Sequence, residues 1–136
     1  MNIRQWLGRA RSINKELKAL EAGKREALAA ATRITQNYEA DGAQTTKDPH
    51  KLDRLAGFIY LIDEKRDELL QTKAEIVGTI YKLTDGRQRT VLLEYYVNCL
   101  SWEEVSVKTH YSWRQTMYLR KAAISQLEKD CIDLHI

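Results

Sequence analysis

Residues 100–115 read LSWEEVSVKTHYSWRQ and contain two helix start signals separated by a short turn. Ser101 and Glu104 have the spacing of a capping box, in which two side chains satisfy free backbone N–H groups at the start of a helix. Ser112 and Gln115 repeat this spacing eleven residues later. Two helix starts so close together predict a short helix, a tight turn and a further helix, which together form a helix-turn-helix.

The neighbouring residues extend this pattern into a small helical domain. The first of the two helices is expected to end near Thr109, followed by a connection at 110–111, and the second is expected to span 112–129. Upstream, Asp85 can cap a helix that runs from about Gly86 to Asn98. The residues expected to face inward from the helices before the turn are Val91, Leu92, Tyr95, Tyr96, Trp102 and Val105.

The helix at 112–129 has two distinct faces at about 100° per residue. The face expected to enter the core comprises Thr116, Leu119, Ala123 and Leu127, and the opposite face carries Arg114, Tyr118, Lys121 and Ser125. An Arg side chain can bind guanine with two hydrogen bonds, and a Gln side chain can bind adenine in the same way. The pattern therefore predicts a recognition helix, whose candidate DNA-contacting residues are Trp113, Arg114, Gln115, Met117, Tyr118 and Lys121.

Other groups near the turn suit the DNA backbone. Backbone N–H groups at helix starts and basic side chains are typical ligands of phosphate oxygens. Trp113 is expected to pack beneath the turn in preference to lying against a deoxyribose. The alternative interpretation of all these charges is a solvated face on a structural helix. The candidate phosphate contacts are Ser101, Trp102, Lys108, Ser112 and Arg120.

The first 83 residues carry two seven-residue repeats of apolar positions, each typical of a long helix that pairs with another. The first comprises Trp6, Ala10, Ile13, Leu17, Leu20, Lys24, Ala27, Ala31, Ile34 and Tyr38. The second comprises Leu52, Leu55, Ile59, Ile62, Arg66, Leu69, Lys73, Ile76, Ile80 and Leu83. The polar residues 40–49 contain turn signals and separate the two repeats. We therefore expect an all-α chain with a helical hairpin at 1–83 and a helix-turn-helix domain at 84–136.

The long apolar seams raise the question of self-association. Neither seam can stay exposed, so the helices pair with each other or with a second copy of the chain. A homodimer held through 1–83 would present two recognition helices to DNA, and Ile13→Asp or Ile62→Asp would disrupt it. The alternative is a hairpin that only supports the last domain.

Composition excludes several classes of function. No glycine-rich phosphate loop, His-Glu-x-x-His motif or nucleophile elbow occurs, so we expect no enzyme, no catalytic residue and no cofactor. Cys131 and His135 could share a helix face, but two ligands do not make a metal site. Cys99 and Cys131 lack Cys-x-x-Cys spacing and no apolar run approaches membrane-spanning length, which predicts a cytoplasmic protein without a membrane partner. The basic start of the chain resembles a membrane-surface helix less than a pairing helix.

The segment Leu92–Leu127, with Leu100–Val105 and Tyr111-Ser112-x-Arg114-Gln115, resembles region 4 of sigma factors. Together with the hairpin before it, the chain is still more similar to the small phage regulators of the ArpU type. The resemblance implies binding at a promoter or late-gene control region and regulation of phage or prophage transcription in a bacterial host cell. Cys99 and His110 stand at turn positions where that pattern often has glycine, so both turns must form without glycine's freedom at positive φ.

Two other classes remain open. A phage DNA-packaging subunit of the small-terminase kind also combines a helix-turn-helix with paired helices, and it would assemble into a ring. A protein-interaction module that docks on RNA polymerase is the other alternative, because residues 84–136 carry seven basic and seven acidic side chains. The expected partner of first choice is double-stranded DNA, with RNA polymerase as a further candidate.

Overall fold

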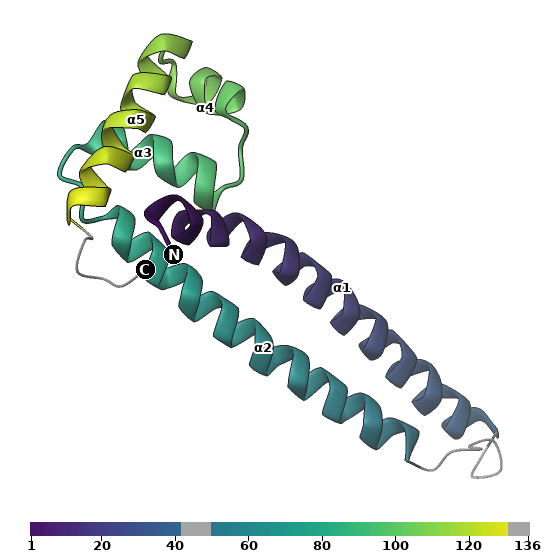
Figure 1. The fold of residues 1–136 in the computed structure, drawn as a ribbon. Coiled ribbons are helices and arrows are strands. Elements are labelled where there is room, and N and C mark those ends of the chain that lie inside the picture. The colour runs from purple at the N-terminus through teal and green to yellow at the C-terminus, as the bar shows by residue number, and fades with distance from the viewer. Residues whose placement is uncertain (42–49, 131–136) are drawn as a thin grey trace. The chain divides into compact units, whose positions relative to one another are not determined.

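The computed structural model describes residues 1–41 and 50–130, with the side chains of 38–41 excepted. All regular structure in these ranges is helical, which confirms the all-α prediction (Figure 1). The helices are α1 (Ile3–Asp41), α2 (Lys51–Ile80), α3 (Gly86–Leu92), the π-helix η2 (Leu93–Val97), α4 (Trp102–Thr109) and α5 (Trp113–Asp130). Most of the predicted loop at 40–49 and the Cys131–His135 pair lie outside the described residues.

The chain forms two compact units, and α1 and α2 each run through both. The helix-turn-helix unit contains Met1–Lys15 together with the residues from Leu70 onward, and the hairpin unit is Glu16–Leu69. This division differs from the predicted boundary at residues 83 and 84. The reason is that the first turns of α1 pack against residues far along the chain, in contacts that periodicity does not reveal.

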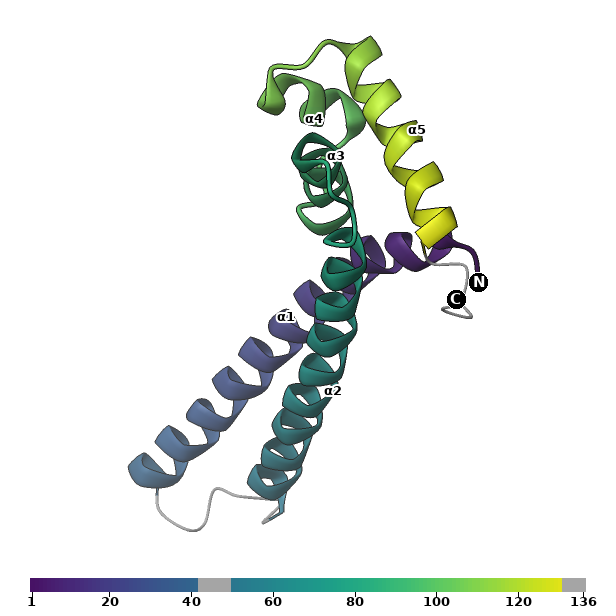
Figure 2. The ribbon, with the colours of Figure 1, turned by 90° about the vertical axis from the view of Figure 1, so that its left-hand side faces the viewer.

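In the hairpin unit, α1 and α2 lie side by side and antiparallel (Figures 1 and 2). Among the described side chains there, the predicted seam positions are the least exposed, although Leu52 stays exposed; Tyr38 lies outside the described side chains. Lys24, a charge on the seam, donates a hydrogen bond to Asp63 at 2.8 Å. This bond lowers the pKa of the Asp63 carboxyl. The ion pair therefore explains how the seam accommodates a lysine.

Local capping in the helix-turn-helix unit follows the sequence signals. The N–H of Glu104 donates to Ser101 Oγ at 3.1 Å and the N–H of Ser101 donates to Glu104 Oε1 at 3.5 Å, which completes the predicted capping box. At the next helix, the N–H of Gln115 donates to Ser112 Oγ at 3.1 Å. The side chain of Asp85 accepts from the N–H of Arg87 at 2.9 Å, and this bond lowers the Asp85 pKa.

Both glycine-free turns adopt the left-handed conformation. Cys99 has φ of 60° and His110 has φ of 63°. Cys99 lies in the connection from η2 to α4, and His110 is the C-cap of α4. Both turns therefore take a positive φ at a residue other than glycine, as the sequence required.

We expect Ser101→Ala to lower the free energy of unfolding by about 1 kcal/mol, because the first turn of α4 then has an unsatisfied N–H group. Urea denaturation of the full chain measures this loss. Ser125→Ala is the control, since Ser125 is exposed on α5. Equal stability of Ser101→Ala and the wild type would show that the capping box contributes nothing.

The core of the helix-turn-helix unit draws on α1 to α5. The predicted inward face of α5 is buried, as are Trp102, Val105, Val91 and Leu92. The expected helix 86–98 differs in one respect, because its second half is the π-helix η2. The wider turn allows Tyr95 to stack on Trp102 while Tyr96 is buried beside it. α5 also buries Ile124. The other buried apolar residues come from the two long helices and from Leu83 after α2: Ile3, Leu7, Ala10, Ile13, Ile76, Ile80 and Leu83.

Candidate nucleic-acid interface

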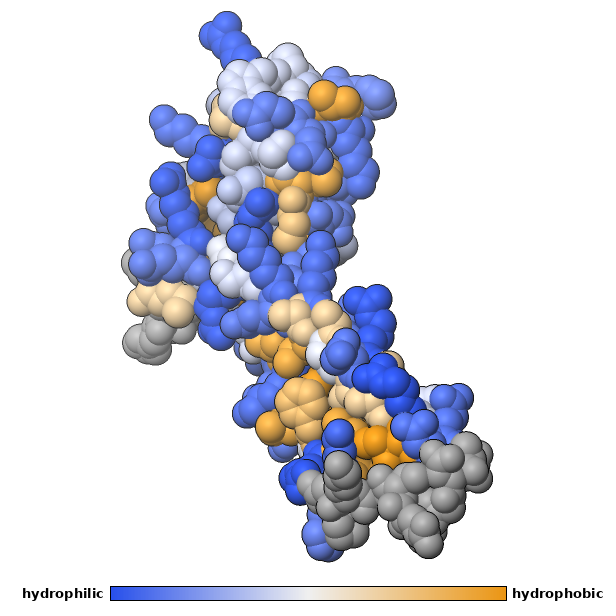
Figure 3. All heavy atoms as spheres, turned by 90° about the vertical axis from the view of Figure 1, so that its right-hand side faces the viewer, coloured by the Kyte–Doolittle hydropathy of each residue, from blue (hydrophilic) through white to orange (hydrophobic). Residues whose placement is uncertain are grey.

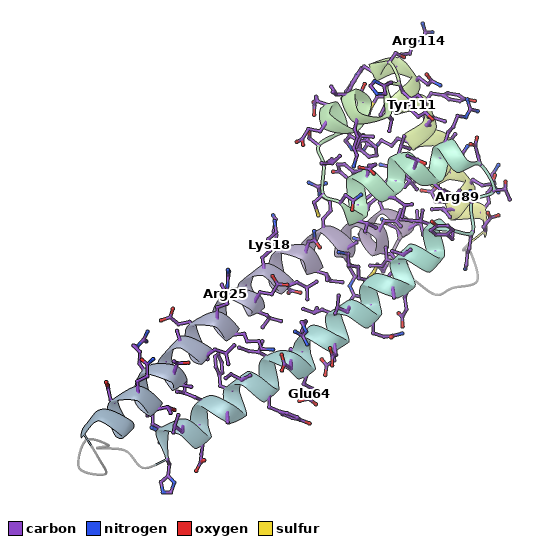
Figure 4. The ribbon with its side chains drawn as sticks, turned by 180° about the vertical axis from the view of Figure 1, so that it is seen from behind. Lys18, Arg25, Glu64, Arg89, Tyr111 and Arg114 are labelled. Atoms are coloured by element: carbon purple, nitrogen blue, oxygen red, sulfur yellow. The ribbon has the colours of Figure 1, made fainter. Side chains whose placement is uncertain are left out.

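α5 presents one polar face to solvent, and it is the face that the helical angles predicted. Arg114, Tyr118, Lys121 and Ser125 are all exposed, whereas Gln115 and Met117 beside them are half-buried. Arg114 extends away from the domain at the start of α5 (Figure 4). The helix follows α4 after a short turn (Figure 2). The exposed side chains are therefore free to meet a partner along the first two turns of α5.

Trp113 does not pack beneath the turn, and that prediction is wrong. The residue is 49% exposed. The turn is closed by other groups, because the Ser106 hydroxyl donates to the carbonyl of Tyr111 at 2.7 Å. Trp113 consequently adds an exposed aromatic ring to the same end of α5 as Arg114.

The predicted phosphate contacts divide into exposed and engaged groups. Ser101 and Ser112 stand at the starts of α4 and α5, where backbone N–H groups point along the helix axis. Lys108 Nζ lies 2.8 Å from Glu94 Oε2, so its charge is partly neutralised within the domain. The Trp102 side chain is only 9% exposed, which leaves its backbone N–H as the group that can contact a phosphate.

Arg120 belongs to a stack of rings and guanidinium groups that links four helices. Its guanidinium lies 4.8 Å from the Trp102 ring centroid. The Trp102 ring stacks on the Tyr95 ring, with 4.0 Å between their centroids. The guanidinium of Arg11, from α1, lies 4.2 Å from the Tyr95 ring centroid. Arg120 is half-buried, so it supports the domain as well as facing solvent.

Arg11 connects the start of α1 to the connection before α4. Its Nη1 donates to the carbonyl of Tyr95 at 2.7 Å and to that of Leu100 at 3.0 Å. Asn14 Nδ2 contacts Cys99 Sγ at 3.1 Å, and Lys73 Nζ donates to Asn14 Oδ1 at 2.7 Å. Burial raises the pKa of Tyr96 within the same cluster. Sequence analysis missed this cluster because Arg11 stands more than eighty residues before its partners.

Residues 1–15 belong to the helix-turn-helix unit, and they make its net charge positive. Residues 84–136 alone are balanced, but the helix-turn-helix unit as a whole has thirteen Lys and Arg against eight Asp and Glu. The hairpin unit has nine Lys and Arg residues against eleven Asp and Glu residues. The positive charge of the chain is therefore concentrated in the unit that holds α5, and residues 1–15 supply it through Arg4, Arg9, Arg11 and Lys15.

The described residues contain no group of three or more His, Cys, Asp or Glu side chains that could hold a metal ion. Among the same residues, no helix is long and apolar enough to span a membrane. Comparison with family models, curated proteins and solved structures finds no match for this chain.

Proposed function

We propose that this chain is a sequence-specific DNA-binding regulator of phage or prophage transcription that reads the major groove with α5. The observation that carries the proposal is the exposed row Arg114, Tyr118 and Lys121 on the second helix of a tightly capped helix-turn-helix. A helix in this position enters the major groove with its N-terminal residues against the bases. The likeness of Leu92–Leu127 to sigma region 4 and to ArpU-type regulators supports the same reading.

Each exposed group has a distinct role in this proposal. Arg114 binds a guanine edge, and Gln115 binds an adenine edge once it turns outward from its half-buried position. Lys121 and the N–H groups at the starts of α4 and α5 bind phosphate oxygens. The net positive charge of the helix-turn-helix unit supports backbone attraction, which the balanced 84–136 segment by itself would not.

The test begins with selection of bound fragments from random and phage DNA libraries, followed by binding measurements on the selected site. Arg114→Ala should weaken binding to that site by about 1–3 kcal/mol and relax specificity at one base pair, whereas Lys121→Ala should weaken binding to all sequences alike. Lys129→Ala is a control, because Lys129 is exposed near the far end of α5. Wild-type affinity in both Arg114→Ala and Lys121→Ala across salt concentrations would refute DNA reading by this face.

We further propose that the DNA-bound form is a homodimer. A single helix-turn-helix has a small interface whose energy is largely phosphate attraction, so tight binding at physiological salt requires a second recognition helix. A selected site with twofold symmetry and half-sites one helical turn apart is the expected result. A ring of eight or more chains in a solution mass measurement would favour the DNA-packaging alternative instead.

One observation favours a second candidate function, which is docking on RNA polymerase. Val107 on α4 and Trp113 on α5 are exposed apolar side chains beside the polar face, and exposed apolar groups are typical of protein interfaces. Val107→Glu should abolish retention of the chain by purified RNA polymerase while binding of the selected DNA persists. Equal retention of the variant and the wild type would remove this candidate surface.

A further inference from the structure

The connection between η2 and α4 is held by a side chain from the start of α1. Arg11 Nη1 donates to the Tyr95 carbonyl at 2.7 Å and to the Leu100 carbonyl at 3.0 Å. Tyr95 lies in η2, and Leu100 directly precedes Ser101, the N-cap of α4. One guanidinium nitrogen therefore ties the end of one helix to the start of the next.

The hydrogen bond to Tyr95 satisfies a carbonyl at a helix end. The last carbonyls of a helix have no donor within that helix. In a π-helix the carbonyl of Tyr95 would accept from the N–H of Leu100. That N–H donates instead to the carbonyl of Glu94, at 3.1 Å. Arg11 supplies the Tyr95 carbonyl with a donor in its place.

The same connection contains a residue in an unfavourable backbone conformation. Cys99 has φ of 60°, in the left-handed region that residues other than glycine rarely adopt. Such a conformation persists only where the surrounding structure holds it. Asn14 Nδ2 donates to Cys99 Sγ at 3.1 Å, and Lys73 Nζ donates to Asn14 Oδ1 at 2.7 Å. Side chains of α1 and α2 therefore both hold the residues directly before α4.

A stack of side chains continues from Arg11 into α4 and α5. The Arg11 guanidinium lies over the Tyr95 ring, and the Tyr95 ring stacks on Trp102, the first residue of α4. The guanidinium of Arg120, on α5, lies 4.8 Å from the Trp102 ring centroid. Closely packed groups transmit a displacement to their neighbours. A shift of Arg11 should therefore move the start of α4 and its contact on α5.

Arg11 is engaged within the helix-turn-helix unit. Its side chain is half-buried, and its Nη1 donates to two carbonyls. The surface of this unit that Figure 3 shows is mostly hydrophilic, with its apolar residues in small separate patches. The exposed basic side chains on the recognition face are Arg114 and Lys121. An effect of Arg11 on DNA binding beyond its single charge must therefore pass through the residues that it holds.

We propose that Arg11 is a positioning residue for DNA reading. It holds the start of α4 and, through Tyr95 and Trp102, the orientation of the recognition helix α5. This inference rests on the proposed DNA-binding function. Base contacts by Arg114 depend on the orientation of α5, whereas general attraction to phosphates depends on charge. Loss of Arg11 should therefore reduce the preference for the selected site, and not only the overall affinity for DNA.

The test compares Arg11→Met with Arg9→Met in the full chain. Each variant loses one positive charge from α1 and keeps a long apolar side chain. Arg9 is the matched control because it is exposed and its guanidinium lies over Trp6 of the same helix, 5.3 Å from the ring centroid. Both variants should weaken binding to unselected DNA equally. Arg11→Met alone should lower the ratio of affinities for selected and unselected DNA, by at least about tenfold, as for one lost base contact.

Fluorescence anisotropy titrations at a single salt concentration measure both affinities, because phosphate attraction depends on salt. A double-mutant cycle with Tyr95→Leu then tests whether Arg11 acts through the stack. The double variant should lose no more of the affinity ratio than the larger of the two single losses, since both substitutions break the same chain of contacts. Near-ultraviolet circular dichroism, which reports on packed aromatic rings, should change in Arg11→Met while the far-ultraviolet helical signal stays that of the wild type.

A wild-type affinity ratio in Arg11→Met, an equal loss of the ratio in Arg9→Met, or additive losses in the cycle would each overturn the proposal. Loss of the far-ultraviolet signal in Arg11→Met would also overturn it, because Arg11 would then be needed for folding and not for position. If the wild type selects no site, the proposed function itself fails. The near-ultraviolet signal then still decides whether Arg11 holds the ring stack.

Discussion

Trp102→Ala should lower the free energy of unfolding by about 3–5 kcal/mol, the range for removing a large aromatic side chain from a core. Trp102 is buried between the Tyr95 ring and the Arg120 guanidinium, so truncation leaves both groups without their stacking partner. The loss should appear in urea denaturation followed by circular dichroism. We expect a lower urea concentration at the midpoint. The slope of the unfolding free energy against urea concentration should not change, because the surface exposed on unfolding stays similar.

Trp113→Ala is the matched control for this experiment. The two tryptophans stand eleven residues apart, but Trp113 is half exposed and makes no part of the stack. Its truncation should change stability by less than about 0.5 kcal/mol, as expected for a surface position. If Trp102→Ala unfolds like the wild type, or if Trp113→Ala costs as much, the described arrangement of the two rings would be refuted.

Ile62→Asp should destabilise the hairpin by more than about 4 kcal/mol, since it removes a buried apolar side chain and places a carboxylate in the apolar seam. Ile62 is only 4% exposed, and it is one of three apolar side chains that the described hairpin unit buries. The variant should therefore lose helical circular dichroism. Simple dissociation of a folded dimer, which we expected from the sequence for a charge on the seam, is no longer the expected result.

Tyr60→Asp provides the comparison, since Tyr60 lies two residues earlier on α2 and is 72% exposed. It introduces the same aspartate into the same helix and should retain the helical signal of the wild type. If the Ile62→Asp variant stays folded and differs from the wild type only in the mass of its assembly in solution, the seam faces another chain.

The positions of the helices and turns were predictable from the sequence because their causes are local. Ser101, Ser112 and Asp85 cap helices through hydrogen bonds that span two or three residues, so spacing alone reveals them. The buried and exposed faces of α5 follow from helical periodicity, and Thr116 and Arg114 lie where the angles placed them. The candidate recognition face was accessible to the same reasoning.

The tertiary structure decided the features that depend on residues far apart in the chain. Arg11 joins the helix-turn-helix unit by donating to carbonyls more than eighty residues away, and no repeat or motif marks that contact. Trp113 is exposed because the Ser106–Tyr111 hydrogen bond closes the turn without it. Pairing of the two seams within one chain likewise depends on α1 and α2 meeting in space. Periodicity specifies which side of a helix is apolar, but the partner for that side is chosen by long-range packing.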